Sequence, residues 1–104
     1  MRNQEKLLKK IKEKKIRVGV IGLGYVGLPL AILLAKKGFK VDGYTKNEKE
    51  VSLIRDGFSR IGMDKELKRI LQTGNLKVQS IKIKKLQHDE VYIICVPTPI
   101  DKNK

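Results

Sequence analysis

Apolar residues of this chain gather in short, nearly continuous runs that are typical of strands buried in a parallel sheet. Residues 16–21 and 91–96 are runs of this kind, residues 40–44 are expected to form the second strand, and residues 76–79 alternate like a strand. Pro97 and Pro99 follow the last run and force an extended exit from it. Residues 80–86 either continue the third strand or form a short helix, and the pattern fits both.

Two segments between the second and third of these strands carry apolar residues at helical spacing instead. The first opens at Asn47, which together with Glu50 resembles a capping box, and it ends at Gly57. The second covers residues 64–73, with Asp64 as its N-terminal cap and Gly74 as its stop. The pattern therefore predicts two consecutive helices.

The first strand leads directly into a G-x-G-x-x-G turn, and a third helical pattern follows and stops at Gly38. Gly22 lets the chain turn sharply, Gly24 lets the backbone approach a pyrophosphate, and Gly27 lets the helix pack close to the sheet. The N-terminus of that helix offers free N–H groups to phosphates. This context predicts a dinucleotide-binding turn.

The element order is strand, helix, strand, two helices and two strands, which predicts an α/β fold. We expect a Rossmann-like parallel sheet with flanking helices, forming part of a dinucleotide-binding half. Residues 16–104 are interpreted as the N-terminal part of such a domain, without its substrate and C-terminal domains.

Residues 1–15 form a separate basic leader, in which Leu7, Leu8 and Ile11 lie at helical spacing. This predicted helix either contacts a membrane surface or an acidic partner, or it is a solvated helix ahead of the first strand. Because its apolar face is small, the sequence favours the solvated helix.

The net charge of +13 and the pI of about 10.0 are also typical of proteins that bind nucleic acid. However, lysines are spread along the chain, aromatic residues make up only 5%, and no zinc-finger spacing or RNP-like run is present. We therefore expect no specific nucleic-acid binding. Affinity from charge alone would fall steeply with salt.

Cys95 is the single cysteine, which excludes an internal disulfide and a multi-cysteine metal site. It lies in the last predicted strand, where we expect it to pack in the core. His88 stands in a polar stretch and is interpreted as a solvated loop residue. No segment reaches the roughly 20 apolar residues of a membrane span, and the N-terminus has no apolar signal core. We expect a cytoplasmic protein that binds no metal.

Two segments carry a resemblance to a known family. Residues 21–31 read IGLGYVGLPLA and residues 94–99 read ICVPTP, at about the separation that this family uses. They resemble the nucleotide-sugar 6-dehydrogenases, the UDP-glucose/GDP-mannose dehydrogenase family. The Leu28-Pro29 form is more similar to the UDP-N-acetylglucosamine and UDP-N-acetylmannosamine dehydrogenases than to the UDP-glucose branch. The resemblance covers roughly residues 16–101.

The resemblance implies that a complete enzyme uses NAD to oxidise the C6 alcohol of a UDP-sugar to a carboxylate, in two successive hydride transfers. It implies a covalent cysteine thiolate in a later domain, so Cys95 is not that nucleophile. It also implies that the glycine turn holds the pyrophosphate of NAD and that the exit of the fourth strand lines the cofactor. The implied cofactor residues are Gly22, Gly24, Tyr25, Val26, Gly27, Pro97 and Thr98.

The sequence departs from the family pattern at the end of the second strand, where an acid normally binds the adenosine ribose. Thr45 stands there, followed by Lys46, and Asp42 lies inside the strand, too early to substitute. Thr45 can still form a hydrogen bond to ribose, and Lys46 could attract the 2′-phosphate of NADP. NAD is the expected cofactor, bound more weakly than usual, and NADP stays open.

The glycine turn is accompanied by no paired carboxylates, no activated nucleophile and no general base in a credible setting. We therefore expect the isolated, truncated chain to bind a dinucleotide without catalysis, and to meet a nucleotide-sugar substrate only in a complete enzyme. The alternative is a non-catalytic dinucleotide-sensing or interaction module. In either case, an exposed sheet edge favours self-association.

Overall fold

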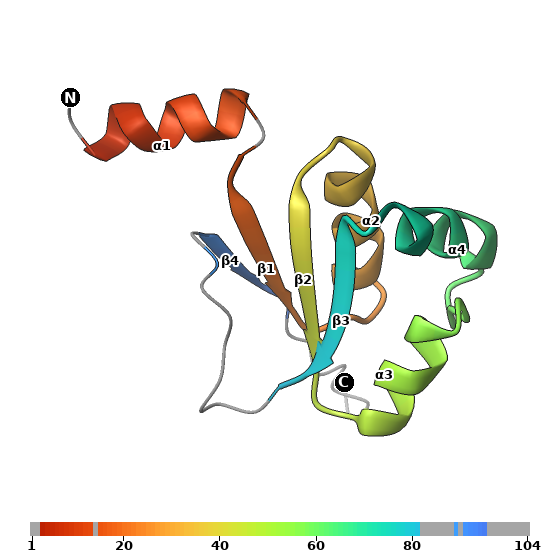
Figure 1. The fold of residues 1–104 in the computed structure, drawn as a ribbon. Coiled ribbons are helices and arrows are strands. Elements are labelled where there is room, and N and C mark those ends of the chain that lie inside the picture. The colour runs from red at the N-terminus through yellow and green to blue at the C-terminus, as the bar shows by residue number, and fades with distance from the viewer. Residues whose placement is uncertain (1–2, 14, 82–88, 90, 96–104) are drawn as a thin grey trace, which may run out of the picture.

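The computed structural model describes residues 3–13, 15–81, 89 and 91–95, and these form a parallel sheet with flanking helices (Figure 1). In chain order the elements are α1 (Asn3–Lys12), β1 (Arg17–Ile21), α2 (Gly27–Lys36), β2 (Lys40–Thr45), α3 (Glu48–Arg55), α4 (Asp64–Thr73), β3 (Leu76–Ser80) and β4 (Val91–Ile94). The sheet has the order β3-β2-β1-β4, and every pairing is parallel. The predicted α/β fold with a parallel sheet is confirmed.

Helices α2, α3 and α4 cover one side of the sheet, which we call the helix face (Figure 1). The connections from β1 to β2 and from β2 to β3 step in the same direction across the sheet, so right-handed crossovers place their helices on the same side. The step from β1 to β4 runs the other way. We call the remaining side the opposite face.

The apolar core lies between the sheet and these three helices. Its members come from the predicted strands, from the inward sides of the predicted helices and, for Leu23, from the glycine turn. The buried core residues are Ile16, Val18, Val20, Leu23, Leu28, Ala31, Ile32, Ala35, Val41, Val51, Ile54, Leu67, Ile70, Leu76 and Val78. This single layer of apolar contacts holds the C-terminal ends of β1 and β2 in place, where the candidate site lies.

The helix ends follow the predicted stops, with one error at a start. Gly74 caps α4 in the left-handed conformation, and its N–H group donates to the carbonyl of Leu71. Asp64 is not the cap of α4: it is the first helical residue, and its Oδ1 accepts from the backbone N–H of Ser59 at 2.8 Å. The prediction was wrong because the carboxylate closes the preceding loop instead of the helix.

Asn47 does cap α3, because its side chain accepts from the backbone N–H of Lys49 at 2.9 Å. Glu50 does not complete the expected capping box. Its Oε2 instead accepts from the hydroxyl of Thr45 at 3.1 Å. The side chain thus faces the end of β2 and not the start of its own helix.

The last strand is less buried than expected. In β4 the residues alternate in exposure, with Tyr92 38% and Ile94 66% exposed. A buried strand was predicted, but within the described part of the chain helices cover only the helix face of the sheet (Figure 1). Cys95 follows the strand, is half-buried and packs against the core, and its N–H group donates to Ile21. Val96 and most of the 80–86 segment lie outside the described residues.

Helix α1 lies apart from the sheet, beyond the N-terminal end of β1 (Figure 1). Its residues Leu8 and Ile11 are 56% and 38% exposed. The helix predicted within residues 1–15 is present, and these two apolar side chains are exposed to solvent. Across the ranges that the structure describes, no helix is both long and apolar enough to cross a membrane.

Candidate cofactor site

The first glycine of the turn has a conformation and surroundings that exclude a side chain. Gly22 has φ of 98°, a backbone region that residues with a Cβ rarely adopt. A Cβ at this position would lie 2.0 Å from the carbonyl oxygen of Cys95. Because Cys95 follows β4, the turn is wedged between the ends of β1 and β4.

The third glycine brings α2 directly onto this turn. A Cβ at Gly27 would lie 1.6 Å from the carbonyl oxygen of Gly22 and 3.3 Å from the Cβ of Cys95. The helix can begin here only because Gly27 has no side chain. Its first N–H groups are then held at the carboxyl edge of the sheet, at the point where the strand order reverses.

The middle glycine has the opposite environment. A Cβ at Gly24 would meet no atom within 4 Å, and the neighbouring side chains of Tyr25 and Val26 are exposed. Packing therefore accounts for Gly22 and Gly27 but not for Gly24. Open space beside a backbone at a helix N-terminus is what a pyrophosphate requires, so the residues present fit a dinucleotide.

A pocket of about 250 Å³ adjoins the open side of this turn. It is somewhat smaller than the roughly 300–1,000 Å³ usual for small-molecule sites. Leu23, Gly24, Tyr25 and Leu28 line it from the turn and α2, while Glu50, Leu53, Ile54, Phe58, Ser59, Arg60 and Ile61 line it from α3 and the loop that follows. The walls are mainly apolar, with one carboxylate and one guanidinium group.

At the ribose position, Thr45 ends β2 as expected, but it is only 7% exposed. Its hydroxyl donates to Glu50, and Glu50 also lies 3.5 Å from Nη1 of Arg60. Lys46 is exposed. The sequence analysis missed Glu50 as a site residue, having treated it only as a helix cap. The sequence did contain a signal for Glu50. The strand end lacks its usual acid, and Glu50 is an acid in the first turn of the helix that follows.

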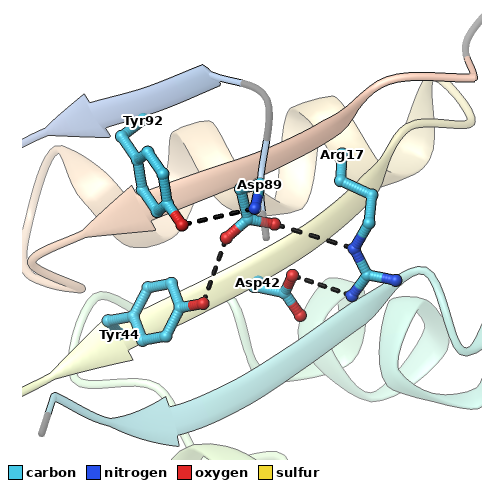
Figure 2. Close-up of polar contacts among 5 residues, drawn as sticks. All are labelled: Arg17, Asp42, Tyr44, Asp89 and Tyr92. Carbon is cyan, nitrogen blue, oxygen red and sulfur yellow. Dashed lines mark hydrogen bonds and ion pairs between the residues drawn. The ribbon is translucent and has the colours of Figure 1, made fainter. Parts of the chain in front are cut away.

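Asp42 takes no part in this site, because it belongs to a buried polar cluster on the opposite face (Figure 2). Nη2 of Arg17 donates to Oδ2 of Asp42 at 2.8 Å, and Nε of Arg17 lies 3.7 Å from Oδ1 of Asp89. The hydroxyl of Tyr44 donates to Asp89 at 3.0 Å, and the backbone N–H of Asp89 donates to the hydroxyl of Tyr92. Both carboxyl groups are buried.

The sequence analysis did not identify this carboxyl pair, which lies away from the glycine turn. Burial raises the pKa of Asp89 to about 7, with a further contribution from the neighbouring Asp42 carboxyl. The same Asp42 carboxyl raises the pKa of Arg17. Within the described residues, Oδ1 of each carboxyl has no hydrogen-bond partner. Because the pair is buried away from the glycine turn, we interpret it as structural.

The other predicted positions add little. Pro97, Thr98 and His88 lie outside the described residues. Cys95 lies with the strand end, in contact with the core. Over the described part of the chain, no group of three or more His, Cys, Asp or Glu residues could hold a metal ion.

Comparison with known proteins gives the same outline. Residues 16–104 match the model of the UDP-glucose/GDP-mannose dehydrogenase family, NAD binding domain. A UDP-N-acetyl-D-mannosamine dehydrogenase of Pyrococcus horikoshii is 40% identical over 88 residues, which cover 82% of this chain and 21% of that protein. Its counterpart in Methanocaldococcus jannaschii is 47% identical over 87 residues, or 80% of this chain and 19% of the relative.

Solved structures agree in fold. The UDP-D-ManNAc dehydrogenase of Pyrococcus horikoshii superposes with a TM-score of 0.74 at 39% identity, over 83% of this chain and 21% of that one. A ternary complex of GDP-mannose dehydrogenase from Pseudomonas aeruginosa also gives 0.74, at 35% identity, over 85% of this chain and 21% of that one. The chain spans about a fifth of the length of the curated relatives it matches.

Proposed function

This chain belongs to the UDP-glucose/GDP-mannose dehydrogenase family, whose cofactor is NAD, and we propose that it supplies the NAD-binding part of a nucleotide-sugar 6-dehydrogenase. The observation that carries the proposal is the contrast among the three glycines of the turn. Two are fixed by packing, and the third leaves its backbone open beside a pocket.

The residues of the turn would hold the pyrophosphate of NAD. Gly22 and Gly27 fix the loop against the ends of β1 and β4, and the N-terminus of α2 directs backbone N–H groups and positive dipole charge to the open side of Gly24. Tyr25 and Val26 flank this open side, and Pro97 and Thr98 are proposed to line the cofactor from the chain after β4. When bound, NAD would accept the hydride that is removed from the substrate.

The proposed substrate of the complete enzyme is a UDP-N-acetylhexosamine, oxidised at C6. Several relatives at 40–47% identity are named UDP-N-acetyl-D-mannosamine dehydrogenases, which supports this choice. We propose that the 104-residue polypeptide alone binds NAD without oxidising the sugar. The cytoplasmic location expected from the sequence stays a prediction.

We also propose that the isolated polypeptide self-associates. Tyr92 and Ile94 expose apolar surface on β4, which pairs with β1 on one side. Such an edge is a template for pairing with another chain. Sedimentation velocity at increasing protein concentration tests this, and a single monomer boundary throughout would contradict it.

Calorimetric titration of the chain with NAD and with NADP tests the cofactor site. Gly24→Val is the variant that should lose binding. Its side chain enters open space, so it should block the cofactor while leaving the melting temperature unchanged. Saturable binding of NAD that Gly24→Val abolishes supports the proposal. No saturable binding by the wild-type chain would overturn it.

A second experiment separates an enzyme part from a sensing module. The chain is mixed with the downstream polypeptide of a related UDP-N-acetyl-D-mannosamine dehydrogenase, and NADH formation is followed. Oxidation that depends on the UDP-sugar supports an enzyme part. NAD binding without complementation favours the non-catalytic module.

A further inference from the structure

The end of β2 lacks the acid that usually binds the ribose, and Thr45, which stands in its place, is buried. Thr45 is 7% exposed, and the single hydrogen of its hydroxyl is donated to Oε2 of Glu50. A threonine hydroxyl has only one donor, and because this bond uses it, Thr45 has no hydrogen left to donate to a ribose. Thr45 therefore positions Glu50 and is poorly placed to bind a ribose itself.

Glu50 has the properties of a binding group. It comes from the first turn of α3, lines the same pocket as Gly24, and its side chain is 28% exposed. Thr45 contacts one oxygen of its carboxylate and Arg60 contacts the other. A carboxylate has about four acceptor sites, so it can accept further hydrogen bonds from a ligand.

We propose that Glu50 supplies the carboxylate that binds the adenosine ribose hydroxyls of NAD, in place of the acid missing from β2. This inference rests on the proposed NAD-binding function. The carboxylate reaches the site from the first turn of α3 instead of from the strand end, and the Thr45 hydroxyl and the Arg60 guanidinium orient it. Hydrogen bonds from hydroxyl groups to a carboxylate are charge-assisted and therefore strong.

The proposal also bears on the choice between NAD and NADP. A carboxylate at the ribose repels a 2′-phosphate, so Glu50 favours NAD. Lys46 and Arg60 act in the opposite sense, but both are largely exposed, and their charges are screened by solvent and salt. We expect NAD to bind more tightly than NADP.

The test measures dissociation constants of NAD, NADP, ADP and 2′-deoxy-ADP for the wild-type chain, Glu50→Gln and Glu66→Gln. Glu66 is the matched control, because it is also the third residue of a helix but does not line the pocket. Glu50→Gln should weaken NAD about tenfold, the equivalent of one charge-assisted hydrogen bond. It should also reduce the preference for ADP over 2′-deoxy-ADP and for NAD over NADP, whereas Glu66→Gln should change none of these.

Moving the carboxylate gives a second, independent result. Thr45→Asp alone places two carboxylates together and should not improve binding, whereas Thr45→Asp combined with Glu50→Gln should recover most of the lost affinity. Recovered affinity in the double variant would also show that Glu50→Gln does not weaken binding through misfolding.

Two results overturn the inference while NAD binding stands: a wild-type chain that does not distinguish ADP from 2′-deoxy-ADP, or a Glu50→Gln variant that keeps the wild-type preference. Absence of NAD binding by the wild-type chain would overturn the inference together with the proposed function.

Discussion

The two faces of the sheet are stabilised by different interactions, apolar packing on one and polar contacts on the other. On the helix face, Val18, Val20 and Val41 pack against apolar residues of α2, α3 and α4. On the opposite face, Arg17 and Asp89 form part of a buried polar cluster. Apolar burial does not depend on protonation, whereas the cluster contains a carboxyl group whose pKa lies near 7. The two faces should therefore respond differently to substitution and to pH.

The largest expected effect is a cavity on the helix face. Leu67 of α4 is fully buried in the core. Leu67→Ala should lower the free energy of unfolding by about 2–5 kcal/mol, because the lost contacts leave a void. Urea denaturation measures this, and Leu67→Met should lose less than about 1.5 kcal/mol. A small, pH-dependent loss for Leu67→Ala would contradict the assignment of this face to apolar packing.

The opposite face should make stability depend on pH. Asp89 faces Arg17 from β1, Asp42 and Tyr44 from β2, and Tyr92 from β4. Because its pKa is raised from 3.8 to about 7, the folded chain holds a proton more tightly than the unfolded chain between these values. This stabilisation is complete below the lower value and is lost as pH rises towards 7, by up to about 1.4 kcal/mol per pH unit.

Asp89→Asn is the control for this titration, because an amide keeps an acceptor for Tyr44 but cannot ionise. The wild type and the variant share all other titrating groups, so the difference between their unfolding free energies reports Asp89 together with its interaction with Asp42. We expect the difference to shrink at low pH and to grow towards neutral pH in favour of the variant. Parallel curves over this range would show that Asp89 does not titrate as its burial indicates.

A smaller effect on stability is expected at Gly19, the residue of β1 on which the polar cluster packs. A Cβ there would lie 2.6 Å from Cδ1 of Tyr92 and 2.7 Å from Oδ2 of Asp89. Both are side-chain atoms that can shift, so Gly19→Ala should cost about 1–3 kcal/mol. Gly24→Ala is matched in chemistry and meets open space, so its stability should be near that of the wild type. Equal losses for the two variants would contradict the packing at Gly19.

The same two faces explain what the sequence could predict. The helix face follows from apolar periodicity, since Val18 and Val20 in β1 and Leu67 and Ile70 in α4 are spaced for one side of their elements. The glycine turn follows from the motif and its position after a strand. These features depend on residues close together in the chain, and there the fold and the turn were predicted well.

The opposite face depends on strand register, which the pattern does not give. Gly19 pairs with Asp42 and with Tyr92, and this register gathers polar residues from β1, β2 and β4 over a glycine. A glycine inside a strand does indicate close approach of another group, but it does not identify that group. Glu50 was missed for a similar reason, because its bond to Thr45 depends on how α3 packs after β2.

The smallest effect is expected in α1, which lies beyond the end of β1 and apart from both faces (Figure 1). Leu8 is 56% exposed, so Leu8→Ser removes little buried apolar surface. Its effect on the free energy of unfolding should stay within about 0.5 kcal/mol. The urea experiment is best repeated at two protein concentrations, because a loss that grows with concentration would place Leu8 in a contact between chains. A loss as large as that of Leu67→Ala at low concentration would show that α1 is part of the folded core.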